Sequence, residues 1–166
     1  MVHYLDSDLI DYIKSHKELI ENNNFQDFFN SCRLLDRSDI ANFFMFDCKV
    51  DFLNYMTIIP TGLFALCSRL ENLEIPKTVD TIESSAFQGC SNLKFVILYD
   101  SIKIIGDESF RDSGLEAITI PKSVYYLGRH AFRDCKNLKE IELSDRYKND
   151  LKYLGIDENQ TKVILY

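Results

Sequence analysis

The sequence predicts an α+β repeat protein, a short right-handed solenoid with one parallel sheet of about six short strands and a cap of three helices before it. Two observations predict this architecture. One apolar pattern returns every 22 or 23 residues in the later part of the chain, whereas apolar residues in the first part recur at helical spacing. We therefore expect a helical N-terminal cap over residues 1–48 and a solenoid over residues 49–166.

The composition is that of a folded, water-soluble chain. Its 166 residues are 46% hydrophobic and 13% aromatic, which is enough for a substantial core. No apolar run approaches the roughly 18 residues of a membrane helix, and the first residues lack the pattern of a secretory signal. The five cysteines form no C-x-x-C pair, which favours free thiols. We expect a cytoplasmic protein without membrane contact.

The first 48 residues read as three helices. The apolar faces of the first two consist of Leu5, Leu9, Tyr12, Ile13, Leu19 and Ile20, and then Phe25, Phe28, Phe29, Cys32 and Leu35. Ser38 opens the third helix, with Phe43 and Phe44 facing inward. Because the end of a solenoid needs a cover, we expect these faces to pack on the first repeat. The alternative is that this segment, with nine acidic and four basic residues, is itself the binding element.

The repeat is seen most clearly in two segments that align without a gap, residues 75–98 and 120–143. Four ladder positions recur in the same frame. They are Phe64, Phe87, Phe110 and Phe132; Cys67, Cys90, Ser113 and Cys135; Leu70, Leu93, Leu115 and Leu138; and the pairs Met56/Ile59, Val79/Ile82, Ile102/Ile105 and Val124/Leu127. Since one repeat cannot bury its apolar residues alone, we expect each ladder to be buried between neighbouring repeats.

Each repeat also contains an apolar-x-apolar triplet, which is typical of a strand because neighbouring side chains point to opposite faces. The triplets are Val50-Asp51-Phe52, Leu73-Glu74-Ile75, Val96-Ile97-Leu98, Ile118-Thr119-Ile120, Ile141-Glu142-Leu143 and Val163-Ile164-Leu165. Three of the glycines between the triplets have an expected role. We expect Gly114 to take a tighter turn in the third repeat, which is one residue shorter, and Gly106 and Gly128 to serve turns.

The pattern IP-x-x-V-x-x-I-x-x-x-A-F-x-x-C-x-x-L-x-x-I resembles the leucine-rich repeat of the BspA type. The resemblance covers residues 50–143 well and residues 144–166 loosely. It implies a leucine-rich-repeat solenoid that attaches to other proteins, with no catalytic residues in the repeat. Many BspA-like proteins are displayed on a surface or secreted, and this chain differs from them because it lacks an export signal.

No motif indicates an active site. A nucleophile built from Cys135 and His130 is conceivable, but Cys135 occupies a ladder position and His130 falls on a surface turn. A zinc site at Cys67 and Cys90 lacks histidine ligands and a C-x-x-C loop, and no phosphate-binding loop is present. We therefore expect no catalytic residue, no metal, no cofactor and no small-molecule substrate.

The candidate site is the concave face of the sheet. Alternation places Phe95, Ile97 and Tyr99 there, an apolar row where packing requires none. The neighbouring candidates on this face are Asp51, Glu74, Thr119 and Glu142. The opposing interpretation is that Phe95 or Tyr99 lies along a neighbouring row or under a loop. If the row is exposed on the concave face, we expect these residues to bind another protein.

Four functions compete at this stage. The leading one is a non-enzymatic protein-binding module. Because the net charge is −7 and no basic stripe is present, direct nucleic-acid binding is not expected, whereas an inhibitor of a basic host nucleic-acid enzyme, similar to an anti-CRISPR, is one alternative. The others are a surface adhesin that has lost its export signal and an enzyme that uses His3 or His16 in the helical segment.

Overall fold

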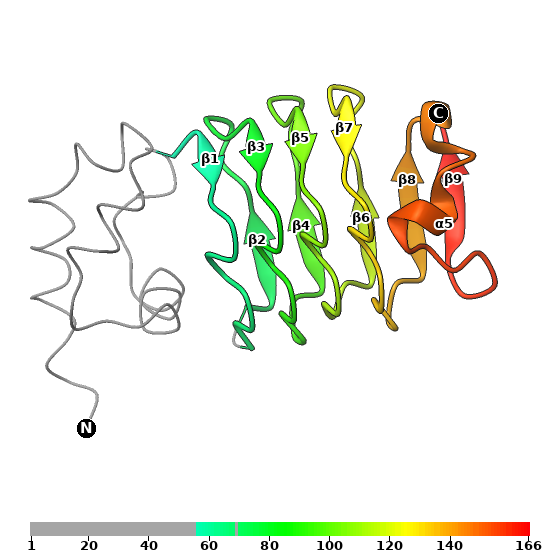
Figure 1. The fold of residues 1–166 in the computed structure, drawn as a ribbon, viewed down its shortest axis with the longest axis horizontal. Helices are drawn as coiled ribbons and strands as arrows, with labels where there is room; N and C mark the ends of the chain where they lie inside the picture. The colour runs from blue at the N-terminus through cyan, green and yellow to red at the C-terminus, as the bar shows by residue number, and fades with distance from the viewer. Residues whose placement is uncertain (1–55, 69) are drawn as a thin grey trace, which may run out of the picture.

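The computed structural model describes residues 56–68 and 70–166, which form a solenoid of stacked coils (Figure 1). The predicted helices of residues 1–48, the first predicted strand at residues 50–52 and the candidate Asp51 lie outside the described residues. The predicted solenoid is therefore seen from Met56 onward.

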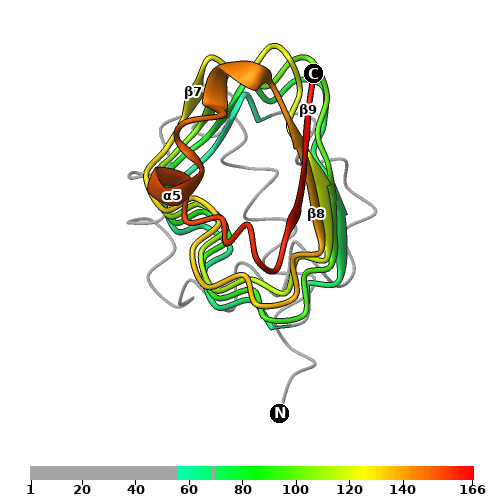
Figure 2. The ribbon, with the colours of Figure 1, turned by 90° about the vertical axis from the view of Figure 1, so that its right-hand side faces the viewer.

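Two parallel sheets run along the solenoid, so the prediction of a single sheet is wrong. The five-stranded sheet consists of β2 (Asn72–Glu74), β4 (Phe95–Ile97), β6 (Ala117–Thr119), β8 (Glu140–Leu143) and β9 (Lys162–Leu165). The four-stranded sheet consists of β1 (Ile58–Ile59), β3 (Thr81–Ile82), β5 (Ile104–Ile105) and β7 (Tyr126–Leu127). Figure 2 looks along the stack and shows β7 and β8 on different sides of the coil.

The second sheet escaped prediction because its strands have only two residues. Alternation cannot be recognised over two positions, so Val79/Ile82 was identified only as an apolar pair. In the structure Ile82 is buried and Thr81 is half-buried beside it. Each coil has to return to its starting side, and its extended return limb satisfies its backbone groups by pairing with the next coil.

The five predicted triplets from Leu73 onward are strands, and the observed bounds of β2, β4 and β6 begin one residue earlier than the triplets. The sixth triplet is also confirmed. It forms β9, which pairs in parallel with β8 in the register Glu140↔Lys162 to Leu143↔Leu165. The sheet therefore continues to the last described coil.

The ladders fill the interior. The rings of Phe64, Phe87, Phe110 and Phe132 stack almost parallel, with centroids 5.3, 5.3 and 5.9 Å apart. All four are at most 1% exposed. The leucine, cysteine and paired apolar positions are buried as well, which confirms the ladder assignments. Because each ring is covered by a ring from the neighbouring coil, burial depends on the stack rather than on any one repeat.

Two short helices replace the ordinary turns after β8. They are the 3-10 helix η2 (Asp145–Tyr147) and α5 (Leu151–Leu154). The Phe110 amide donates to the Ala131 carbonyl, and the Phe132 amide donates in the same way to the Leu154 carbonyl of α5. Helix α5 thus continues the backbone ladder at the place where earlier coils have a turn (Figure 2).

The glycines at the coil corners are needed for a different reason from the predicted one. Neither Gly114 nor Gly128 has a positive φ, and no turn is found at Gly114, so the expected tighter turn there is wrong, whereas the Gly128 carbonyl does accept from the Ala131 amide in a turn. A Cβ on Gly128 would lie 2.4 Å from the Asp107 nitrogen, and one on Gly114 would lie 2.2 Å from the Ser91 oxygen. Both residues let one coil approach the backbone of the coil before it.

Candidate functional site

The candidate residues lie on the outer face of the five-stranded sheet. Within β4, β6 and β8 the central residues Val96, Ile118 and Ile141 face the core, so their neighbours face outward. The register sets Phe95 opposite Ala117, and Ala117 opposite Glu140. It also sets Thr119 opposite Glu142. Two outward rows therefore run side by side across these strands.

Phe95 and Ile97 are the large apolar residues that β4 places on this face. Phe95 is 46% exposed and Ile97 is 52% exposed. The corresponding residues of β2 are Asn72 and Glu74, which pair directly with them. No described loop buries Phe95 or Ile97. Their exposure leaves apolar surface in water with no packing role.

A hollow of about 290 Å³ opens beside this pair. One side is formed by Phe95 and Ile97 of β4, and the other by Glu140 and Glu142 of β8. The small residues Ala117 and Thr119 of β6 lie between them. A long side chain on β6 would fill this space, so the hollow exists because two short side chains stand between two rows of longer ones.

The acidic side of the hollow is only partly compensated. Glu140 Oε2 lies 2.9 Å from the Lys162 ammonium, in an ion pair that is largely exposed and therefore weak. Glu142 Oε2 accepts a hydrogen bond of 3.3 Å from the Thr119 hydroxyl. Among the described residues no lysine or arginine pairs with Glu142. The hollow consequently combines an apolar wall with a negative one.

Tyr99 does not belong to this hollow. It is half-buried beyond the end of β4, its hydroxyl donates to the Glu74 carboxylate, and the Lys77 ammonium lies 4.7 Å from its ring centroid. The hydrogen bond to Glu74 is the main reason why the pKa of Tyr99 is raised, followed by desolvation and the charge of Glu74. Of the seven predicted site residues, Tyr99 and Glu74 thus form a separate contact at the edge of the face.

The structure brings Phe95, Ile97, Thr119 and Glu142 together, and it adds two residues that were not singled out. These are Ala117 and Glu140. The signal for both was in the sequence, because each stands one repeat after an outward residue of the preceding strand. Alternation places Ala117 on this face, but a small residue contributes space rather than contact and is not among the candidate binding residues for that reason.

The thiol of Cys135 is not an activated nucleophile. Its Sγ donates to the Phe110 carbonyl at 3.0 Å and lies 3.4 Å from the Ser113 hydroxyl. Burial raises the pKa of the Cys135 thiol although the hydrogen bonds with Ser113 oppose the change. His130 stands at a turn with a φ of 58°, as Ser85 and Glu108 do in their coils. The described residues also contain no group of three or more His, Cys, Asp or Glu side chains that could hold a metal ion.

Comparison with protein families decides the family. The model of the BspA type leucine rich repeat region matches residues 57–155, in six copies. The chain belongs to the BspA-type leucine-rich-repeat family. The match extends beyond the segment in which the repeat is regular, because it includes η2 and α5.

Solved structures of bacterial leucine-rich-repeat proteins resemble the BspA-type chain. A leucine rich cell surface protein from Faecalibacterium prausnitzii is 30% identical, with a TM-score of 0.51, over 54% of this chain and 24% of that one. A T. pallidum leucine rich repeat protein is 26% identical, with a TM-score of 0.41, over 53% and 52%. A Bacteroides ovatus leucine-rich repeat protein is 21% identical, with a TM-score of 0.39, over 67% and 41%.

The matched part thus spans about a quarter to a half of the lengths of these bacterial proteins. None of the curated proteins matches the BspA-type chain. In the part of the chain that the structure describes, no helix has the length and apolar character needed to cross a membrane.

Proposed function

We propose that this chain is a non-enzymatic protein-binding module that uses the outer face of its five-stranded sheet, centred on Phe95 and Ile97. The observation that carries the proposal is the exposure of these two side chains, 46% and 52%, beside a hollow. Exposed apolar residues next to a concavity, with polar groups around them, are typical of the centre of a protein interface. The leucine-rich-repeat family supports an interaction role in general.

Affinity capture from an extract of the source cells tests the proposal. The wild type is compared with Ile97→Asp and with a matched control, Tyr125→Asp, which changes a side chain that is 63% exposed just before β7 of the other sheet. We expect a partner that the wild type and Tyr125→Asp both retain and that Ile97→Asp loses. The wild type and both variants must show the same thermal unfolding transition, so that loss of a partner reports on binding and not on unfolding. Retention of every captured protein by Ile97→Asp would reject this face as the binding surface.

A surface-attachment role is the second candidate. It is favoured by one observation, the likeness of this chain to a protein that is described as a cell surface protein. Such a module would use the same sheet face but would meet its partner outside the cell. Limited proteolysis of intact source cells distinguishes the two cases, because a surface module would be digested while internal proteins stay intact.

The inhibitor hypothesis has only the net charge of −7 to support it. A net charge of −5 resides in residues 1–48, which are outside the described residues. If the chain were such an inhibitor, its captured partner would be a basic nucleic-acid enzyme, and addition of the chain would slow that enzyme.

A further inference from the structure

The two walls of the hollow differ in chemistry. Phe95 and Ile97 on β4 offer an aromatic ring and an aliphatic surface, whereas Glu140 and Glu142 on β8 offer carboxylates. The separation is fixed by the sheet, because one complete strand, β6, stands between β4 and β8. An occupant therefore meets apolar surface on one flank and negative charge on the other.

The carboxylate most available to an incoming cation is that of Glu142. Glu140 already has Lys162 as a partner, whereas within the described residues Glu142 has no ion pair and accepts a hydrogen bond from the Thr119 hydroxyl. Glu142 is also half-buried, so a cation that reaches it is less screened by water than one at the rim. Charge complementarity thus favours a basic occupant over a purely apolar one.

We propose that the hollow receives an arginine side chain of the bound protein. Its guanidinium would pair with the Glu142 carboxylate while its methylene stem and planar face lie against Phe95 and Ile97. Arginine fits better than lysine because its guanidinium is weakly hydrated, stacks on an aromatic ring and presents two donors to a carboxylate. A leucine would leave Glu142 without a counter-charge in a site from which water has been displaced. This inference rests on the proposed function and names the chemistry that the binding face recognises.

The full chain, labelled with ¹⁵N, is titrated with a pentapeptide that carries one arginine between glycines and is blocked at both ends. Three further peptides replace the arginine with lysine, leucine or citrulline, which keeps the shape of arginine without its charge. We expect the arginine peptide to shift the amides of Phe95, Thr119 and Glu142 with a dissociation constant in the millimolar range. The citrulline and leucine peptides should bind at least about fivefold more weakly.

Two variants separate the hollow from general attraction to an acidic protein. Glu142→Gln should weaken the arginine peptide about fivefold and leave the leucine peptide unchanged. Glu83→Gln is the matched control. Glu83 directly follows β3 in the other sheet, and its Oε2 also accepts a hydrogen bond from a threonine hydroxyl, that of Thr61. Glu83→Gln should bind the arginine peptide as the wild type does. Both variants are first compared with the wild type by thermal unfolding.

The outcomes separate this inference from the proposed function. If Ile97→Asp loses the captured partner but arginine and citrulline peptides bind equally, or Glu142→Gln has no effect, the arginine inference is overturned and the binding face stands. Absence of any shift in the hollow overturns it as well. If Ile97→Asp retains every captured protein, the proposed function fails whatever the peptides do.

Discussion

At the residue scale, left-handed backbone at non-glycine positions marks the corners of the coils. Leu66, Asp112 and Asp134 have φ values of 63°, 54° and 62°, and the equivalent residue of the second repeat is Gly89, with a φ of 71°. Aspartate tolerates the left-handed conformation because its short side chain can form hydrogen bonds with the nearby backbone. A leucine side chain forms no such hydrogen bond. Leu66 is also 78% exposed, so its side chain contributes little packing.

Replacing Leu66 with glycine should therefore stabilise the protein. We expect Leu66→Gly to raise the free energy of unfolding by about 1 kcal/mol, because the left-handed conformation is strained for leucine and free for glycine. Urea denaturation gives the value. Leu66→Ala is the control, since alanine removes the exposed side chain but keeps the strain. An equal gain in both variants would show that the exposed side chain, and not the backbone, causes the effect.

The thiol of Cys90 should make stability depend on pH. Burial, aided by Cys67, raises the pKa of Cys90 from 9.0 to about 12, and its Sγ donates to the Phe64 carbonyl at 3.0 Å. Below about pH 9 the thiol is protonated in both the folded and the unfolded chain, and its contribution to the free energy of unfolding is complete. As pH rises from about 9 towards 12, only the unfolded chain ionises, so the contribution is lost by up to about 1.4 kcal/mol per pH unit.

Urea denaturation between about pH 8 and pH 10 tests this sign, with Cys90→Ser as the comparison. Serine stands at the same ladder position in the third repeat, at Ser113, and is buried there. We expect the wild type to lose stability more steeply than Cys90→Ser over this range. Parallel curves would mean that Cys90 titrates alike in the folded and unfolded chains.

At the scale of the element, the phenylalanine ladder is the main contact between coils. Phe87 stacks on Phe64 and on Phe110, at 5.3 Å in both directions, and it is fully buried. The Phe87 amide donates a hydrogen bond to the Ser109 carbonyl of the next coil, with 2.7 Å between nitrogen and oxygen. Ring and backbone of one residue thus connect three successive coils.

Phe87→Ala should lower the free energy of unfolding by about 3–5 kcal/mol, because it removes a fully buried ring and leaves a cavity. Phe95→Ala is the matched control, since Phe95 is 46% exposed on the outer face, and its loss should stay below about 1 kcal/mol. Chemical denaturation measures both. A loss of several kcal/mol in Phe95→Ala would place that residue in the core and would weaken the proposed binding role.

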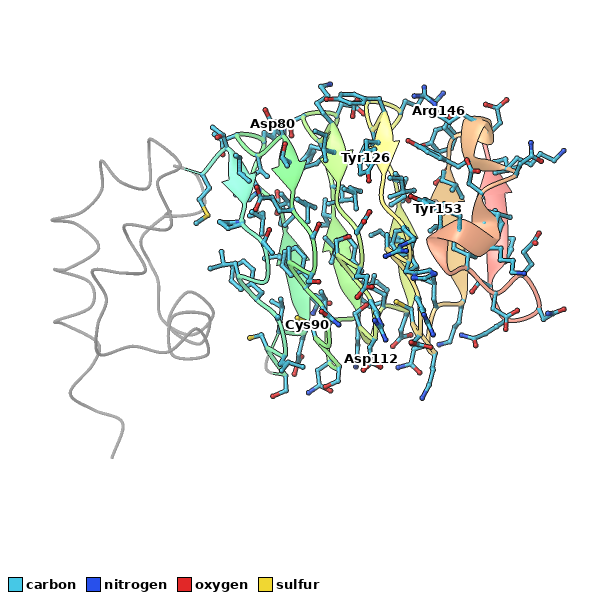
Figure 3. All side chains as sticks on the ribbon, in the orientation of Figure 1. Asp80, Cys90, Asp112, Tyr126, Arg146 and Tyr153 are labelled. Atoms are coloured by element: carbon cyan, nitrogen blue, oxygen red, sulfur yellow. The ribbon has the colours of Figure 1, made fainter. Side chains whose placement is uncertain are left out.

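Exposed aromatic residues on the two sheets differ in their partners. Figure 3 shows side chains projecting from both sheets, with Tyr126 on β7 and Tyr153 on α5. Tyr126 is 45% exposed, yet its hydroxyl donates to Asp107 at 3.1 Å, and that hydrogen bond is the main reason why the pKa of Tyr126 is raised. The Tyr126 hydroxyl is thus held by a carboxylate of the preceding coil, whereas Phe95 and Ile97 have no polar group to be held in this way, which favours the five-stranded sheet as the binding face.

At the scale of the whole molecule, β9 completes the last described coil. It pairs with β8 along its whole length, the Tyr166 hydroxyl donates to the Ile120 carbonyl, and the Asp145 amide donates to the Tyr166 carbonyl. Strand β9 therefore covers the edge of β8 and holds the start of η2 in place.

Deletion of residues 162–166 should lower the thermal midpoint by about 5 °C or more, because it removes these contacts and bares the backbone edge of β8. Self-association should increase at the same time, because the deletion removes Val163, which packs against the core, and so exposes apolar surface. Calorimetry and light scattering after gel filtration measure the two effects. Lys162→Ser is the control, since it keeps the backbone of β9 and removes only an exposed side chain with its weak ion pair to Glu140. A deletion that left both quantities unchanged would show that β9 is dispensable.

The sequence alone determined the period, the ladders and the family of this protein. In a solenoid every coil meets the same interior, so Phe87 and Phe110 see the same surroundings and the same residue type has to recur. It also indicated Phe95 and Ile97, because strand alternation is a local property. The four-stranded sheet was missed because two-residue strands such as Thr81–Ile82 carry no alternation.

Only the tertiary structure decided which outward residues form one site. The hollow needs the register that sets Ala117 opposite Phe95 and Glu140, whereas Tyr99 is drawn to Glu74 of the preceding coil. It also showed that a side chain at Gly128 would collide with the backbone of Asp107 in the preceding coil. These contacts join residues that are about one repeat apart in the sequence. They depend on how closely successive coils approach one another, which the order of residues along one coil does not specify.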